Sequence, residues 1–373
     1  MNRRDVLAAA GAYAAYAAIA RAASAQETDA VSSQARALYE RAFVFDANLD
    51  PPMQEKFPFP KPMLDMVRQS GVNAVKTSLG GFDNNFEDTV AEIAFFQRVF
   101  EEYPDVFLQV RKHSDFADAK RSQRMGVILS FEAVTMHDGK IDRIELFRGL
   151  GVRVMQLTYN KATPFGTGVL GDPHGGLTEL GGKAVETMNK LGVAIDISHS
   201  NETTSFDVLK ASAKPAIITH AGCAAVYQHP RNKSDALLRA VAQKGGVVGI
   251  FDLPYLTPSP KQPTLDDYMA HMTHALDVCG EDHVGIGSDS ALAAWDTSPK
   301  AMAAFRKDEA DRQKAGVAAP GEDARPLYVV GMNTPRRSEV IANALLKRGY
   351  KPGAVEKVLG SNFTDALGRI WQD

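Results

Sequence analysis

Short apolar runs rich in valine and isoleucine alternate along the chain with longer stretches whose apolar residues recur at helical spacing. This alternation is typical of βαβ units that build a parallel sheet. Eight strands with intervening helices are what a closed (β/α)8 TIM barrel requires, and we therefore predict this α/β fold. The eight runs are Phe43–Asp50, Asn73–Leu79, Gly126–Val134, Val152–Asn160, Val193–Ser200, Ala216–Gly222, Val247–Leu253 and His283–Ser290.

Helical segments between and after these runs are marked by apolar spacing and by signals at their ends. Gly181–Leu191 is amphipathic and ends at Gly192, a residue type that favours helix C-termini. Thr264–Cys279 begins at an N-cap threonine followed by two aspartates. The other expected segments are helices at Val90–Glu102, Ser234–Lys244, Arg337–Arg348 and Pro352–Trp371, the last two packed outside the barrel, and loops at Thr163–Gly176 and Lys314–Pro326.

The first 25 residues have the three parts of a signal peptide. Arg3 and Arg4 form a basic start, an alanine-rich apolar run follows, and Ala23-Ser24-Ala25 gives a small-x-small cleavage pattern. The paired arginines indicate the twin-arginine type, which exports folded proteins to the periplasm or beyond. A plain N-terminal helix is the alternative. The run is too short and too rich in alanine for a stable membrane span. Residues 26–373 are then expected to form one barrel domain with C-terminal helices.

Composition narrows the chemistry. The 373 residues have a formal net charge of −3 and are 45% hydrophobic, with no long basic run, so we expect no nucleic-acid partner. Cys223 and Cys279 are the only cysteines, too few for a zinc-thiolate cluster, and whether they pair is left open. Any metal ion must therefore be held by histidine, aspartate, glutamate or asparagine.

Polar side chains stand late in six of the eight runs. In a barrel of this class the carboxyl ends of all strands surround one mouth, where active sites lie. A lone histidine or aspartate there is often structural or a helix cap, whereas a glutamate inside an apolar strand is costly to bury unless paired or bound to metal. The joint placement predicts a metal-binding mouth. Its members are Asn48, Asp50, Glu132, Tyr159, Asn160, His199, His220 and Asp289.

Imidazole and carboxylate ligands suit zinc, manganese, iron or cobalt, and Zn²⁺ is our first candidate, as one ion or two. Glu132 could bridge two ions, which together lower the pKa of a shared water. Asp289 is placed to move a proton between that water and a leaving amine. Asp196 is expected either to orient His199 or simply to fit the barrel interior.

Four stretches now resemble a known family. GLTELGGKAVETMNKLGVAIDISHS, PAIITHAGCAAVYQHPRN, HVGIGSDS and LGSNF are similar to segments of the membrane dipeptidase (renal dipeptidase) family of metallopeptidases, a branch of the amidohydrolase-like barrels. The resemblance runs from about Val44 to about Leu367. It implies hydrolysis of a dipeptide that depends on a divalent metal.

By position, the resemblance also implies roles for individual residues. Glu132, His199 and His220 would hold one ion, with Glu132 bridging to a second ion held by Asp50 and Asn48. Asp289 would be the catalytic acid and base. Arg231 would bind the substrate carboxylate by a bidentate pair. Tyr159 and Asn160 would lie against the substrate.

Two positions depart from the family pattern. Its first strand usually ends in Asp-Gly-His-x-Asp, and here Asn48 replaces the histidine. Because an amide oxygen is a weaker ligand than imidazole for zinc, the first metal site could be weak, selective for a harder ion, or empty. The fourth strand often carries a histidine where this chain has Tyr159, whose phenol can still donate to a developing oxyanion.

Three functions stay open on the sequence. The first is a metal-dependent dipeptidase, with a dipeptide or similar small amide as its only predicted partner. The second is a related hydrolase of another amide, lactam or lactone, because the loop Thr163–Gly176 and the segment Asp50–Pro62 could reshape the pocket. The third is a catalytically impaired binding protein, suggested by Asn48. A homodimer is left open.

Overall fold

The computed structural model describes residues 30–54, 56–81, 84–316, 318, 323 and 325–371. Eight parallel strands follow one another around a barrel in the order β7-β6-β5-β3-β1-β10-β9-β8, and a parallel bridge between Asp196 and Ile217 joins its two ends. The proposed signal peptide lies outside the described residues. The barrel strands are β1 (Phe45–Asp46), β3 (Ala74–Leu79), β5 (Met125–Phe131), β6 (Val152–Gln156), β7 (Ala194–Asp196), β8 (Ile218–Ala221), β9 (Val248–Ile250) and β10 (Val284–Ile286).

Each of the eight predicted runs overlaps a barrel strand, so the predicted (β/α)8 barrel is confirmed. The strands end earlier than the apolar runs suggested. Glu132 follows the end of β5 directly, whereas His199 and Asp289 come three residues after β7 and β10. These residues therefore stand on short loops at the carboxyl-end mouth rather than inside the sheet.

Three further strands lie off the barrel path. β4 (Phe107–Gln109) pairs with the start of β5, while β2 (Leu49–Asp50) and β11 (Ser290–Ala291) pair in parallel above the mouth. The β2–β11 pair continues the neighbouring strands β1 and β10, so it holds the segments that carry Asn48 and Asp289 side by side. The backbone amide of Asp289 donates to the carbonyl of Asn48 at 2.7 Å.

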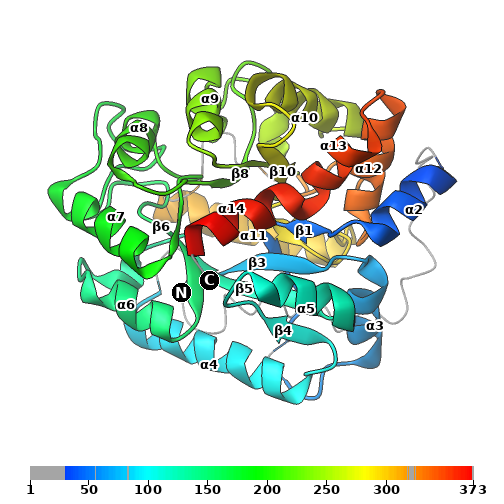
Figure 1. The fold of residues 1–373 in the computed structure, drawn as a ribbon, viewed down its shortest axis with the longest axis horizontal. Coiled ribbons are helices and arrows are strands. Elements are labelled where there is room, and N and C mark those ends of the chain that lie inside the picture. The colour runs from blue at the N-terminus through cyan, green and yellow to red at the C-terminus, as the bar shows by residue number, and fades with distance from the viewer. Residues whose placement is uncertain are drawn as a thin grey trace.

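Helices surround the barrel (Figure 1). The expected loop from Thr163 to Gly176 is irregular, and the other expected loop lies partly outside the described residues. Within the described part of the chain the helical elements are α2 (Ser33–Arg41), α3 (Lys61–Ser70), α4 (Phe86–Glu102), α5 (Ser114–Ser122), η2 (Thr135–His137), α6 (Asp142–Gly149), α7 (Glu179–Leu191), α8 (Glu202–Ala211), α9 (Asp235–Gln243), η3 (Pro254–Leu256), α10 (Leu265–Cys279), α11 (Pro299–Ala315), α12 (Arg337–Lys347), α13 (Pro352–Glu356), η4 (Lys357–Ser361) and α14 (Asn362–Trp371).

The C-terminal helix α14 closes one end of the barrel. Phe363, Leu367 and Trp371 form one buried cluster with inward-facing residues of the strands, including Phe45 and Val154. In Figure 1 this helix runs across the middle of the ring of helices. The sequence suggested only that this helix packs outside the barrel. In the structure it also covers the end of the barrel opposite the mouth.

A close approach of backbones constrains the strands beside His220. A Cβ atom added to Gly249 or Gly287 would lie 2.1 or 1.7 Å from the carbonyl oxygen of Thr219. Only glycine fits at such a contact. Gly249 in β9 and Gly287 directly after β10 thus allow the strand that carries His220 to pack closely against its neighbours.

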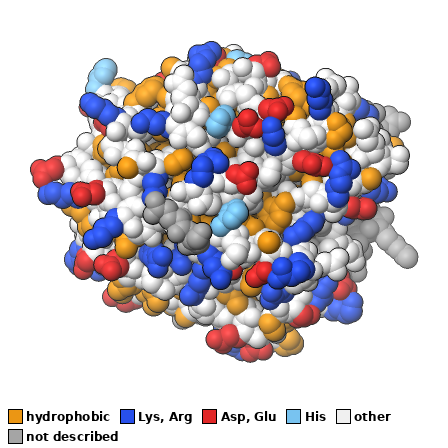
Figure 2. Space-filling view, viewed as in Figure 1, with side chains coloured by type: hydrophobic (Ala, Val, Ile, Leu, Met, Phe, Trp, Pro, Cys, Tyr) orange, Lys and Arg blue, Asp and Glu red, His pale blue; other side chains and the backbone are white. Residues whose placement is uncertain are grey.

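The surface and the cysteines add little functional information. Cationic and anionic side chains are interspersed on the face drawn in Figure 2. Cys223 and Cys279 are both buried and are not bonded to each other. None of the described helices is long and apolar enough to cross a bilayer.

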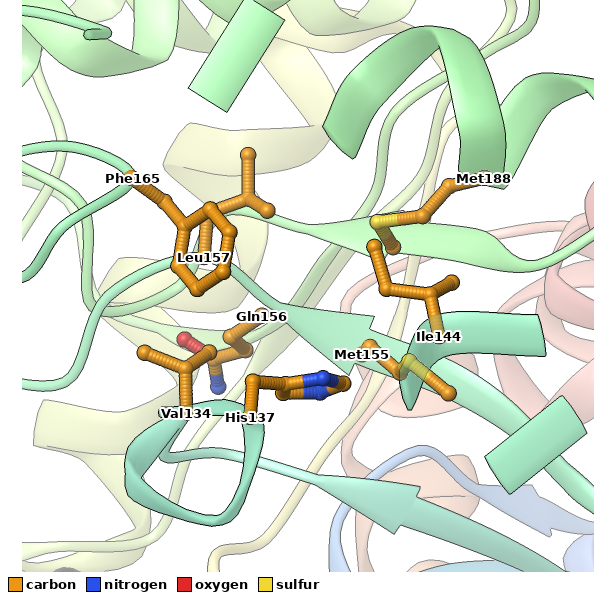
Figure 3. A pocket seen from close by; sticks show the side chains of 8 residues that line it. All are labelled: Val134, His137, Ile144, Met155, Gln156, Leu157, Phe165 and Met188. Atoms are coloured by element: carbon orange, nitrogen blue, oxygen red, sulfur yellow. The ribbon is translucent and has the colours of Figure 1, made fainter. Parts of the chain in front are cut away.

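His137 is a buried structural histidine outside the mouth. Its ring lies among apolar side chains that include Ile144, Met155 and Phe165 (Figure 3). Burial, with a contribution from nearby Arg143, lowers its pKa from 6.5 to about 4. Below about pH 6.5, His137 is therefore protonated in the unfolded chain but stays neutral in the folded chain. The free energy of unfolding falls as a result.

Replacing His137 with phenylalanine removes this pH-dependent penalty. The difference in free energy of unfolding, variant minus parent, should be about 2 kcal/mol larger at pH 5 than at pH 7.5. This follows because one pKa unit corresponds to about 1.4 kcal/mol. Urea denaturation of both proteins at the two pH values measures the difference. An equal gap at both pH values would show that His137 is protonated in the folded protein.

Candidate metal centre

Three side chains from separate barrel segments converge at the mouth. Glu132, His199 and His220 offer one ligand atom each, and these atoms all lie within 4.8 Å of one another. The Nε2 atoms of the histidines are 3.0 Å apart, and His199 Nε2 is 3.7 Å from Glu132 Oε2. Two nitrogen donors at about 2.0–2.1 Å from one zinc ion lie about 3 Å apart, so the spacing fits a shared ion.

The hydrogen bonds behind the histidines fix which ring nitrogens face the cluster. His199 Nδ1 lies 2.8 Å from Asn160 Oδ1, an acceptor. His220 Nδ1 lies 2.9 Å from the hydroxyl of Thr219, which itself donates to Asp196 at 2.5 Å and is therefore an acceptor toward the ring. Both Nδ1 atoms thus carry the proton, and both Nε2 atoms present lone pairs.

Two lone pairs and a carboxylate that face one another need a cation between them. Burial, with the charge of Arg231 next in importance, holds the pKa of both His199 and His220 well below 6.5, so the rings stay neutral at pH 7. Neutral imidazole is the form that binds metal. The donor set of two nitrogens and one carboxylate therefore fits a divalent metal ion of the zinc type.

Asp289 closes the cluster on the side of His220. Its Oδ2 atom lies 3.9 Å from His220 Nε2, and burial followed by repulsion from Glu132 raises its pKa to about 8. Its backbone has a φ of 58°, an uncommon left-handed conformation for a residue with a side chain. Such conformations are often found where a side chain must be held in one direction for function.

The first-strand residues Asn48 and Asp50 form hydrogen bonds with residues other than the three ligands. The side-chain amide of Asn48 donates from Nδ2 to Asp289 Oδ1 at 2.7 Å. Asp50 Oδ1 accepts a hydrogen bond from the Thr77 hydroxyl at 2.9 Å, and desolvation by the surrounding protein, with repulsion from Glu132, raises the Asp50 pKa to about 6. The structure thus brings Asn48 and Asp50 to the mouth but places neither side chain in the described three-ligand cluster.

Two predicted residues of the outer mouth lie next to the cluster. The ring of Tyr159 stacks on His199 with centroids 4.3 Å apart, and burial raises the pKa of its phenol. Arg231 is buried, and its Nε and one terminal nitrogen have no hydrogen-bond partner among the described residues. A buried guanidinium with free donors is suited to receive a carboxylate.

Three further polar residues surround the ligands. Asn160, predicted to contact the substrate, is buried and lies behind His199. Asp196, which was expected either to orient His199 or to fit the barrel interior, supports His220 through Thr219. Lys76 was missed, although a lysine within the apolar run of β3 is as unusual as Glu132. Its Nζ lies 3.5 Å from Glu132 Oε1 and 4.0 Å from Asp196 Oδ2.

A parallel barrel with a histidine and carboxylate cluster at its mouth defines a class of metal-dependent hydrolase-like barrels. The chain belongs to the membrane dipeptidase family (peptidase family M19), whose family model matches residues 32–302. The resemblance found in the sequence is thereby confirmed.

Individual relatives agree with this assignment. "Dipeptidase tcpJ" from Claviceps purpurea is 26% identical over 77% of this chain, and "Dipeptidase verJ" from Clonostachys rogersoniana is 32% identical over 76% of it. The chain spans only 60% and 65% of the lengths of these two relatives.

Solved structures share the fold over nearly their whole length. An amidohydrolase from Pseudomonas aeruginosa has 26% sequence identity and a TM-score of 0.78, covering 91% of this chain and 99% of its own. A metallo peptidase from Rhodobacter sphaeroides, solved with a phosphinate mimic of the dipeptide L-Ala-D-Ala, has 20% identity and a TM-score of 0.71, covering 88% and 99%. The second likeness bears on the fold alone.

Proposed function

We propose that this protein is a metal-dependent dipeptidase. Membership of the membrane dipeptidase family and the dipeptidase names of the two relatives above support the activity. The observation that carries the proposal is the arrangement at the mouth, where the inward lone pairs of His199 and His220 lie near a buried Arg231 with free donors. An ion site beside a carboxylate-binding cation is what cleavage of a peptide bond next to a free C-terminus requires.

Each residue of the mouth then has its own role in hydrolysis. A bound divalent ion, for which we propose Zn²⁺, would polarise the peptide carbonyl and lower the pKa of the attacking water. Arg231 binds the C-terminal carboxylate of the dipeptide and so sets the position of the scissile bond. Tyr159 donates to the carbonyl oxygen as negative charge develops on it. Asp289 carries a proton from the water to the leaving amine.

The function is tested with purified protein, a panel of L,L- and L,D-dipeptides, and Zn²⁺, Mn²⁺ or Co²⁺. We expect release of free amino acids, loss of activity on removal of metal by a chelator, and recovery when metal is returned. N-acyl amino acids and a lactam serve as competing substrate classes. Failure to cleave any dipeptide with any of these ions, while one of the other classes is cleaved, would refute the assignment.

Arg231→Met should raise KM for dipeptides about 10- to 100-fold, because hydrogen bonds to a charged group contribute about 1.5–3 kcal/mol. Methionine also removes a buried charge, so the fold should tolerate the change. A dipeptide amide, which lacks the C-terminal carboxylate, provides the matched control substrate. If KM rises equally for both substrates, Arg231 does not bind the C-terminal carboxylate of the dipeptide.

We also propose export by the twin-arginine route, supported by the order of the basic, apolar and small-residue parts of residues 1–25. Cell fractionation should recover the protein outside the cytoplasm, and lysine in place of Arg3 and Arg4 should retain it inside. Export that survives this change would contradict the route.

A further inference from the structure

A buried lysine lies beside Glu132 at the mouth. Lys76 is in the middle of β3, its side chain is 1% exposed, and its Nζ atom has no hydrogen-bond partner among the described residues. The nearest acidic atoms are Glu132 Oε1 at 3.5 Å and Asp196 Oδ2 at 4.0 Å. A charged lysine is rarely buried this completely unless it neutralises acidic groups.

Glu132 therefore faces two different partners with its two oxygens. Oε2 lies on the side of His199, within the ligand cluster, and Oε1 lies on the side of the Lys76 ammonium. A carboxylate between two metal ions would offer one oxygen to each ion. In this chain one of those two positions already faces a fixed positive charge.

Asn48 and Asp50, which were predicted to hold a second ion, offer only oxygen ligands, and both side chains form hydrogen bonds with other residues. Asn48 points its NH₂ group toward Asp289, and Asp50 accepts from Thr77. Only the Oδ1 atom of Asn48 could bind a cation, and an amide oxygen is a weaker ligand for zinc than imidazole. A second ion would therefore find no histidine among these residues, only an amide oxygen and a carboxylate that already accepts a hydrogen bond.

We infer that the site holds a single divalent ion on Glu132, His199 and His220, and that the Lys76 ammonium supplies the charge that a second ion would otherwise give to Glu132. The donors present fit one ion and do not fit a pair. Two ions of a binuclear site lie about 3.5–4 Å apart, so a second ion sharing Glu132 would meet the like charge of Lys76 at short range. The inference rests on the proposed metal site, but it does not depend on which substrate is cleaved.

The test counts bound ions in the full chain. Metal-free protein is loaded with excess Zn²⁺, dialysed, and analysed by mass spectrometry of the metal, and a parallel sample with Mn²⁺ is examined by electron paramagnetic resonance. We expect one zinc ion per chain and the spectrum of isolated rather than coupled Mn²⁺. Two tightly bound ions, or none, would overturn the inference, whatever the activity of the sample.

Variants test the reason for the single ion. Lys76→Met combined with Asn48→His removes the ammonium and adds an imidazole, and it should raise the count from one to two. Lys233→Met is the matched control, because Lys233 is also buried but donates to the Ser200 carbonyl at 2.8 Å. It should leave the count at one. A folded double variant, judged by circular dichroism, that still binds one ion would refute the role of Lys76.

The two proposals can fail separately. One bound ion without dipeptide cleavage would refute the proposed activity and leave the single-ion site in place. Dipeptide cleavage with two bound ions would do the reverse.

Discussion

Replacing His220 with alanine is expected to remove the metal ion and abolish hydrolysis. His220 contributes one of two inward lone pairs, and its ring is held by Thr219 and Asp196. Loss of a residue that only supports a ligand already costs about 10- to 100-fold in metal affinity, so loss of the ligand itself should cost more than about 100-fold. Zinc content after dialysis and the rate of dipeptide cleavage measure both effects.

His283→Ala is the matched control for this change. His283 precedes β10 at the other end of the barrel, and its ring bonds the carbonyl of Gly246. We expect this variant to keep its zinc and its activity. If His220→Ala retained its zinc, or if both variants lost zinc equally, the assignment of His220 as a ligand would be wrong.

Asp289→Asn should lower kcat by about 10²- to 10⁴-fold, the usual contribution of a positioned acid or base, with zinc content unchanged. Asparagine keeps the shape of the side chain, and its oxygen can still accept the hydrogen bond from Asn48. Asparagine also tolerates the left-handed backbone of this position better than alanine would. The change therefore removes the ability to carry a proton and little else.

Asp138→Asn provides a control of the same chemistry. Asp138 has a φ of 50°, similar to that of Asp289, but its side chain is exposed and paired with Lys140. The kcat of the Asp138→Asn variant should match that of the parent protein. A normal kcat in Asp289→Asn, measured at saturating dipeptide, would show that proton transfer does not pass through Asp289.

The barrel could be predicted from the sequence because its strands are buried on both faces. Such strands give continuous apolar runs, and each of the eight runs overlaps a barrel strand. Polar residues late in apolar runs, such as Glu132 and His220, stand out for the same reason. The family pattern then pointed to Arg231, which has no such signal of its own.

Elements with weak patterns were missed. β4 has three residues, too few for a period to show, and α11 has Glu309 as its one buried position among the residues described in that helix. A helix without an apolar stripe gives no helical periodicity. Neither element supplies a side chain to the three-ligand cluster.

The sequence could not predict which polar side chains contact one another, because these contacts depend on the directions of side chains on different strands. The sequence left open whether Asp196 orients His199 or fits the barrel interior, and only the structure shows that it reaches His220 through Thr219. Lys76 carried a signal in the sequence, since a charged residue inside an apolar run needs a partner. That partner, Glu132, lies 56 positions further along the chain, just after the end of β5, the strand that pairs with β3.

The central claim, that Glu132, His199 and His220 bind one divalent ion, is tested most directly by anomalous X-ray scattering at the zinc edge from a crystal grown with Zn²⁺. We predict one strong peak at about 2.0–2.1 Å from the Nε2 atoms of both histidines and within bonding distance of a Glu132 oxygen. A peak elsewhere, or no peak between these three side chains at full zinc loading, would contradict the claim.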